Sequence, residues 1–259
     1  SCNFRCLHCQ NFSISQTDFE EGRAGLEGHT QEYLPERVVA LAEKLGCRGV
    51  AWTYNEPTIW FEYTYDSARL ARERGLYTAY VTNGYMTEDG LGAIAPYLGA
   101  YRVDVKAFTD AFYREVSSAR LKPVLERVES AVKKGIHVEL VYLVIPTKND
   151  REEELQQFVE WVAGLSKDIP VHFTRFHPDY RLTGLPPTPV GTLERAREIG
   201  LERLRYVYTG NVPGHEGENT YCYNCGSLLI ERWGFMVRKM EITEENRCPS
   251  CGAMIAVVR

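Results

Sequence analysis

A unit of one helix followed by one strand recurs along residues 35–208, and it limits the possible folds more than any other feature of this chain. Amphipathic helical stretches alternate with short apolar runs, and Gly46, Gly75 and Gly135 stand at junctions between them. We predict helices over residues 35–45, 57–74, 87–98, 122–134, 150–165 and 191–200. We predict strands over residues 49–53, 76–82, 100–105, 136–145, 171–176 and 204–208. This alternation indicates a parallel sheet with right-handed crossovers.

The number of units favours an α/β fold in the form of a partial (β/α)6 TIM-like barrel over residues 1–209. A dinucleotide-binding fold is less suitable, because no G-x-G-x-x-G stands where that fold needs it. The chain opens with Ser1 directly on a cysteine cluster, without a methionine. We therefore expect an N-terminal segment, carrying one further strand, to be missing before Ser1.

The last 50 residues have a different character. Residues 210–220 are broken repeatedly by Gly and Pro, and we predict a linker there. Residues 221–259 are too few to form a stable core without a cross-link such as a bound metal ion. This tail has four cysteines that could bind one, so we predict a small separate metal-binding module over residues 221–259.

Composition excludes several classes of protein. Of the 259 residues, 44% are hydrophobic and 25% are charged, which is typical of a globular protein and excludes disorder, collagen and coiled coil. The longest apolar runs, such as residues 136–145, fall far short of the roughly 20 residues of a membrane span. A net charge of −5 gives no overall attraction to nucleic acid or anionic membrane. We expect no nucleic-acid or membrane partner.

The eight cysteines fall into groups of three, one and four. A disulfide scaffold would need a higher density, roughly 8 to 10% of residues. Close spacing without a signal peptide indicates metal ligation in a reducing, cytoplasmic compartment. The lone Cys47 precedes an apolar strand, and we expect it to be a buried small hydrophobe.

The tail group predicts a mononuclear metal site. It consists of two CxxCG knuckles, 22 residues apart, formed by Cys222, Cys225, Cys248 and Cys251. This pattern is typical of zinc ribbons and also of rubredoxin, where the ion is iron; we favour structural zinc. A hairpin is expected over residues 228–240. Charges in the tail nearly balance, which argues against a nucleic-acid-binding ribbon.

The first group places Cys2, Cys6 and Cys9 within eight residues. Zinc would recruit a fourth ligand, for which His8 is the nearest candidate, whereas an iron–sulfur cubane can leave one iron open to a small molecule. Polar and turn-forming residues also end most predicted strands, at residues 53–57, 82–84, 104–106, 146–150 and 175–178. In barrel-like folds these strand ends share one face, where the chemistry collects.

The C-x3-C-x2-C spacing resembles the signature of the radical S-adenosylmethionine (SAM) enzymes, with His8 in the place of the usual aromatic residue. This resemblance implies that the three cysteines hold three irons of a [4Fe-4S] cluster. SAM would chelate the fourth iron, and one electron would cleave SAM to methionine and a 5′-deoxyadenosyl radical that abstracts a substrate hydrogen. Phe4 and Leu7 would exclude water from the cluster, although plain loop packing explains them equally well. No catalytic side chain beyond the cluster and SAM site is assigned.

The resemblance also implies a set of SAM contacts. Tyr54, Asn55 and Glu56 stand, with the following proline, where the family usually has Gly-Gly-Glu-Pro, and their strand end would accept hydrogen bonds from the SAM amino group. The D-x-K pair is similar to that of the glycyl-radical activating enzymes: its lysine would face the SAM carboxylate, and its aspartate the ribose or ammonium. An ordinary surface ion pair is the alternative. This pair is Asp104 and Lys106. The other implied SAM contacts are Asn83 and His177.

Over almost its whole length the chain resembles the radical SAM proteins of the AmmeMemoRadiSam system, which are related to pyruvate formate-lyase activating enzymes. The similarity lies in CNFRCLHCQN, TYNEPT, TNGY, the linker sequence GNVPGH and the four-cysteine tail. It implies a one-electron reductant such as flavodoxin or ferredoxin, and an unidentified protein or small-molecule substrate. Glycyl-radical activation of a protein is one possibility. Residues 12–50 lack the extra ferredoxin-type cysteine clusters common in activating enzymes.

A second class of function stays open at this stage: a non-enzymatic metal-binding protein-interaction module with two zinc sites. A visible absorption band that dithionite bleaches would separate the two readings. His215 lies in the predicted linker, and we expect it to be solvent-exposed.

Overall fold

The computed structural model describes residues 1–16 and 31–258. The chain separates into two compact units, Ser1–Glu139 with Pro178–Gly184, and Leu140–His177 with Leu185–Arg259. Six parallel strands follow one another in the sheet order β1-β2-β3-β4-β5-β6, and a three-stranded sheet has the order β7-β8-β9. No helix of the described residues is both long and apolar enough to span a bilayer.

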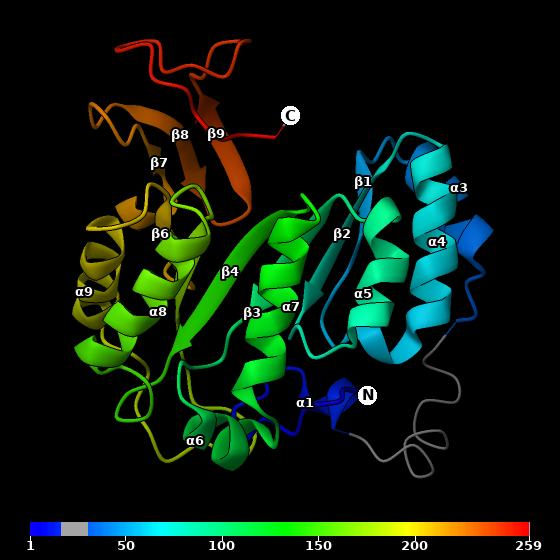
Figure 1. Cartoon of the computed structure of the whole chain (residues 1–259), viewed down its shortest axis with the longest axis horizontal. Helices are drawn as coiled ribbons and strands as arrows, with labels where there is room; N and C mark the ends of the chain where they lie inside the picture. The colour runs from blue at the N-terminus through cyan, green and yellow to red at the C-terminus, as the bar shows by residue number, and fades with distance from the viewer. Residues whose placement is uncertain (17–30, 259) are drawn as a thin grey trace. The chain divides into compact units, whose positions relative to one another are not determined.

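The first unit contains three parallel strands, each followed by helical segments (Figure 1). The strands are β1 (Gly49–Trp52), β2 (Tyr77–Thr82) and β3 (Ala100–Asp104). The α-helices are α1 (Phe12–Ser15), α3 (Pro35–Lys44), α4 (Phe61–Glu73), α5 (Glu88–Ile94), α6 (Asp110–Phe112) and α7 (Leu121–Lys133). The other turns are 3₁₀ segments η1 (Pro57–Trp60) and η2 (Ala95–Tyr97), and the π-helical turn η3 (Tyr113–Ser117).

Helices α3 and α4 pack against each other because each has one apolar face. Val39 and Ala42 of α3 form a core cluster with Ala71 of α4 and with Leu76, the residue before β2. Parallel pairing aligns Gly49 of β1 with Tyr77 of β2, so both strands end at the same edge of the sheet. The loops that leave β1, β2 and β3 therefore start from one side of this unit.

The second unit carries the rest of the parallel sheet and the tail. Its parallel strands are β4 (His137–Val144, which begins in the first unit), β5 (Val171–Arg175) and β6 (Val207–Gly210); its helices are α8 (Glu152–Leu165), α9 (Val190–Leu201) and the 3₁₀ turn η4 (Glu216–Glu218). The tail holds β7 (Thr220–Tyr221), β8 (Leu228–Trp233) and β9 (Met236–Met240). Strands β8 and β9 form the hairpin predicted over residues 228–240.

The tail shares a core with the chain next to β6. Tyr206 belongs to the cluster that the tail forms, and its hydroxyl accepts a hydrogen bond from the amide of Ala256 at 3.0 Å. The tail members of this cluster are Cys222, Leu229, Ile230, Ile242, Cys248 and Ile255. Two of the four predicted ligands are thus also core residues.

Three sequence predictions are corrected by the structure. Cys47 is exposed rather than buried, because its amide closes the turn after α3 on the carbonyl of Ala42 (2.9 Å) and its side chain faces outward. Strand β6 spans Val207–Gly210 instead of residues 204–208, because the amide of Leu204 still bonds Gly200 at the end of α9. His215 is half-buried instead of exposed: its ring nitrogens lie 3.1 Å from Thr209 Oγ1 and from Glu194 Oε1.

Candidate iron–sulfur and SAM site

The loop that carries Cys2, Cys6 and Cys9 is fixed by main-chain hydrogen bonds to two other segments of the first unit. The amides of Arg5 and Leu7 donate to the carbonyls of Ser117 and Val116 at 3.0 and 2.8 Å. The amide of Arg181 donates to the carbonyl of Leu7 at 2.9 Å. The loop is therefore held along its length by η3 and by the segment 178–184.

Phe4 anchors the loop in the core. Its ring is buried and meets the rings of Tyr85 and Tyr113 edge-on, with centroids 5.2 and 6.1 Å away. Leu7 is half-buried. Phe4 thus closes the inner side of the loop, and the water-excluding role given to it and to Leu7 stays a prediction.

Burial makes the free thiols poor acids. Removal from water raises the pKa of Cys2 to about 11 and raises the pKa of Cys6 as well. Metal binding reverses this preference, because the thiolate is the ligand. Two buried polar atoms at this loop, His8 Nε2 and Ser117 Oγ, have no hydrogen-bond partner in the described chain. Three thiols with unpartnered polar atoms near them suit a sulfide-bearing cluster.

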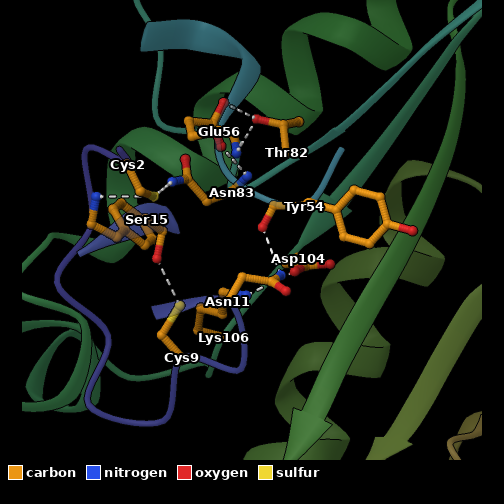
Figure 2. Close-up of polar contacts among 12 residues, drawn as sticks. Cys2, Cys9, Asn11, Ser15, Tyr54, Glu56, Thr82, Asn83, Asp104 and Lys106 are labelled. Carbon is orange, nitrogen blue, oxygen red and sulfur yellow. Dashed lines mark hydrogen bonds and ion pairs between the residues drawn. The ribbon is translucent and has the colours of Figure 1, made fainter. Parts of the chain in front are cut away.

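Glu56 clamps the end of β1 to the end of β2 (Figure 2). Its buried carboxylate accepts hydrogen bonds from the amide and hydroxyl of Thr58, at 3.0 and 2.6 Å. It also accepts from the hydroxyl of Thr82 at 2.7 Å and from the amide of Asn83 at 2.8 Å. Burial raises the pKa of Glu56, and these bonds oppose that shift by favouring the carboxylate. The carboxylate therefore accepts four hydrogen bonds from the protein itself.

Asn83 joins this clamp to the cysteine loop. Its side-chain nitrogen donates to Asn3 Oδ1 at 2.7 Å and lies 3.6 Å from Cys2 Sγ. Its side-chain oxygen accepts from the amide of Tyr85 at 2.8 Å. The predicted site residues Cys2, Glu56 and Asn83 are therefore brought together by direct contacts, as Figure 2 shows.

Asp104 and Lys106 form an ion pair at the end of β3, with 2.8 Å between Oδ2 and Nζ. The lysine side chain is 16% exposed, so the pair is not an ordinary surface contact. Burial alone would lower the pKa of Lys106, but Asp104 and Cys6 outweigh it and raise the pKa above its usual range. The ammonium therefore stays charged beside the cysteine loop.

Tyr54 adopts a backbone conformation that favours glycine. Its φ is 76°, and its ring is 71% exposed. Asn11, two residues beyond Cys9, donates from its side chain to the carbonyl of Tyr54 at 2.6 Å. The neighbouring Asn55 is half-buried. This strand end is thus tied to the cysteine loop by a bond that the sequence did not suggest.

His177 follows β5 in the second unit and is exposed. Its assignment as a SAM contact stays a prediction. Several polar residues at the cysteine loop were missed from the sequence: Asn3, Asn11, Ser15 and Ser117. Each is a common loop or turn residue, and no signal in the sequence pairs it with a cysteine.

The four tail cysteines form a compact group in the second unit. Their sulfur atoms all lie within 4.8 Å of one another, with 3.6 Å between Cys222 and Cys251 and 3.7 Å between Cys225 and Cys248. The glycine after each knuckle, Gly226 and Gly252, has a φ of 75°. Four thiols at this separation suit one tetrahedral ion.

The radical SAM superfamily profile matches residues 1–159. The chain belongs to the radical SAM superfamily. The match begins at the cysteine loop and covers the strand ends of the first unit. This membership implies a [4Fe-4S] cluster and SAM as cofactors, and it decides for an enzyme against a non-enzymatic module with two zinc sites.

Three similar proteins illustrate the range of relatives. An uncharacterized protein of Methanocaldococcus jannaschii is 46% identical over 260 residues, covering 99% of this chain and 75% of that protein. Pyruvate formate-lyase 1-activating enzyme of Escherichia coli is 22% identical, over 76% of this chain and 84% of the enzyme. Isethionate sulfite-lyase activating enzyme of Nitratidesulfovibrio vulgaris is 29% identical, over 52% of this chain and 43% of that enzyme.

Solved structures support the fold. A domain of pyruvate-formate lyase-activating enzyme from Bacteroides vulgatus aligns with a TM-score of 0.56 and 13% identity, covering 63% of this chain and 99% of that domain. Streptococcus suis SuiB bound to SAM aligns with a TM-score of 0.62 and 13% identity, covering 80% of this chain and 48% of SuiB. With the six-stranded parallel sheet, these similarities confirm the predicted partial radical SAM barrel.

Proposed function

We propose that this radical SAM enzyme abstracts a hydrogen atom from a polypeptide substrate, in the manner of an activating enzyme. The observation that carries the proposal is the linked site of the first unit, in which Cys2, Asn83 and Glu56 are joined by direct contacts at the end of β1 and β2. Relatives named as activating enzymes support a protein substrate. Glycyl-radical formation is the most specific form of this proposal.

Different residues would bind the cluster and SAM. A cluster held by Cys2, Cys6 and Cys9 would supply the electron that cleaves SAM to methionine and a 5′-deoxyadenosyl radical. Lys106, kept charged by Asp104, would attract the SAM carboxylate. The main chain of Tyr54 and Asn55 would accept from the SAM amino group, while Glu56 holds this strand end in position. Asn83 and His177 complete the proposed SAM contacts.

A direct test measures SAM cleavage in the absence of substrate. Anaerobically reconstituted protein should show a visible band that dithionite bleaches, and should then release 5′-deoxyadenosine and methionine. Cys6→Ala should abolish this release, because one cluster ligand is lost, while the tail keeps its metal. A colourless wild-type protein without 5′-deoxyadenosine would contradict the proposed function, and joint loss of the tail metal would show that the two sites are coupled.

The substrate class needs a second experiment. Reduced enzyme and SAM are incubated with anaerobic extract, separated by filtration into protein and small-molecule fractions. Stimulated 5′-deoxyadenosine release by the protein fraction, with an organic radical signal in electron paramagnetic resonance, is the expected result. Stimulation confined to the small-molecule fraction would overturn a polypeptide substrate. Adding flavodoxin or ferredoxin in place of dithionite tests the proposed one-electron donors.

We further propose that the tail ion is structural zinc and that residues 221–259 act as a separate module after the linker at 210–220. Four thiolates closing a tetrahedral site are the common structural zinc arrangement. Elemental analysis of protein purified with all its metal would give one zinc per chain in addition to the iron of the cluster. Rubredoxin-type iron in the tail would contradict this. The cytoplasmic location stays a prediction.

A further inference from the structure

Each cysteine of the first loop has a buried polar side chain close to it. Ser15 Oγ lies 3.0 Å from Cys9 Sγ, and Asn83 Nδ2 lies 3.6 Å from Cys2 Sγ. Ser117 lies next to Cys6, because the amides of Arg5 and Leu7, on either side of that cysteine, donate to the carbonyls of Ser117 and Val116. The three side chains come from α1, the end of β2 and η3, so three separate elements supply one polar group per cysteine.

These three polar side chains are almost completely buried, and burying a polar group without a hydrogen-bond partner destabilises the fold. Ser15 is 2% exposed, Ser117 0% and Asn83 6%. The hydroxyl of Ser117 has no hydrogen-bond partner in the described chain, although a buried hydroxyl without an acceptor costs about 1–3 kcal/mol. A bound cluster provides the missing acceptor, because its sulfur atoms accept hydrogen bonds.

The backbone conformation around Ser117 positions this residue next to the cysteine loop. Ser117 ends the π-helical turn η3, and the next residue, Ser118, has a φ of 54°. Single π-helical turns are frequent at functional sites. The carbonyls of Val116 and Ser117 accept hydrogen bonds from the amides on either side of Cys6, so the same turn holds the loop and places the Ser117 side chain near its middle cysteine.

We propose that Ser15, Ser117 and Asn83 form a set of hydrogen-bond donors, one beside each cysteine, that raises the reduction potential of the [4Fe-4S] cluster. The proposal rests on the cluster that family membership implies. The reduced cluster carries more negative charge on its sulfur atoms, so donors stabilise it more than the oxidised form. The donor set therefore makes reduction of the cluster by an external one-electron donor easier, and it lowers the driving force for the later electron transfer from the cluster to SAM.

The test uses Ser15→Ala and Ser117→Ala, which remove a hydroxyl with almost no change of volume. Ser67→Ala is the matched control: Ser67 is equally buried, but its hydroxyl donates to the carbonyl of Tyr63 within α4. Each full-length variant is reconstituted anaerobically, and its cluster midpoint potential is measured by a dye-mediated titration followed by electron paramagnetic resonance. Resonance Raman spectra report the iron–thiolate stretching frequencies.

Both serine variants should have a more negative midpoint potential than wild type, and the double variant a larger shift in the same direction. Their iron–thiolate frequencies should rise, because the hydrogen bond that weakens these bonds is gone. Ser67→Ala should match wild type. Unshifted potentials and frequencies in both serine variants would overturn the proposal, as would lower unfolding stability without any change of potential.

This outcome is separate from that of the proposed function, because the potential is measured without SAM or substrate. A normal cluster with shifted potentials in the variants, but no 5′-deoxyadenosine from wild type, would contradict the proposed function alone. Normal SAM cleavage with unshifted potentials would contradict the donor set alone.

Discussion

Glu56 shows how a single side chain organises the site without being available to a ligand. Its carboxylate faces only donors: two amides and two hydroxyls, from residues 58, 82 and 83. Because Thr82 and Asn83 belong to the next strand end, the carboxylate fixes two loops at once. Asn83 in turn reaches Cys2. The position of the cysteine loop therefore depends on the ends of β1 and β2, through Glu56 and Asn83.

Glu56→Gln tests this clamp. The amide nitrogen of glutamine would face at least one donor, and leaving a buried donor unsatisfied costs about 1–3 kcal/mol. We expect the free energy of unfolding, measured in urea, to fall by that amount. Glu62→Gln, which changes an exposed glutamate at the start of α4, is the control and should have little effect. Equal stability of both variants would show that the clamp is not structural.

Tyr54 gives a second prediction at this scale. A non-glycine residue in the left-handed region costs about 1–2 kcal/mol, part of which the greater freedom of glycine in the unfolded chain offsets. Tyr54→Gly should therefore be more stable than Tyr54→Ala by about 0.5–1 kcal/mol in chemical denaturation. At Tyr77, an exposed residue within β2, the order should reverse, with alanine more stable than glycine. The same order at both positions would argue against strain at Tyr54.

Sequence spacing singled out the cysteines, and strand ends together with the family resemblance singled out Glu56 and Asn83; the structure brings Cys2, Glu56 and Asn83 together. The partners Asn3, Asn11, Ser15 and Ser117 left no local pattern, since their roles depend on contacts between distant segments. The exposure of Cys47 was missed for a related reason: a turn, rather than the following apolar strand, sets its environment.

At the scale of elements, short connecting segments carry much of the organisation of the first unit. Asp110 at the start of α6 receives hydrogen bonds from Arg114 within the turn and from the amide of Leu121, the first residue of α7. Arg120 lies 3.5 Å from the same carboxylate. Asp110 therefore connects the start of α7 to the segment that supports the cysteine loop.

This connection predicts a pH dependence. The hydrogen bond from Arg114, followed by that from Leu121, lowers the pKa of Asp110 below its ordinary value of 3.8. Its stabilisation is therefore present above pH 3.8 and lost as the pH falls through the lower native value. Asp110→Asn should be less stable than wild type at pH 7, and the difference, measured in unfolding curves, should shrink only when the pH falls below 3.8. Asp66→Asn, at an exposed position of α4, controls for the loss of one surface carboxylate. A difference that stays constant down to pH 3 would refute the linkage.

Long periodic elements were predicted well: α3, α7, α8 and β2 lie within about two residues of their expected bounds, as the apolar period dictates. The segment with α6 and η3 was missed, because it is too short to show a helical period. The start of β6 was placed too early, since Leu204 and Tyr206 are apolar but belong to the turn after α9 and the tail core.

At the scale of the whole molecule, the two cysteine groups belong to different compact units. The first group depends on strand ends and loops of its own unit, whereas the tail thiols are part of a small core with Tyr206, Leu229 and Ile255. A module of this size cannot bury enough apolar surface alone, so its ion should supply much of its folding energy.

Cys248→Ser tests this division. Cys248 is buried in the tail core and is one of the four ligands, so its loss should release the tail ion and expose the amides of β8 and β9. Hydrogen–deuterium exchange should then show loss of protection over residues 220–257, while β1, β2 and β3 stay protected. Elemental analysis should show loss of the tail metal with the iron content retained. Unchanged protection in β8 and β9 after metal loss would mean that the apolar core, rather than the ion, stabilises the tail.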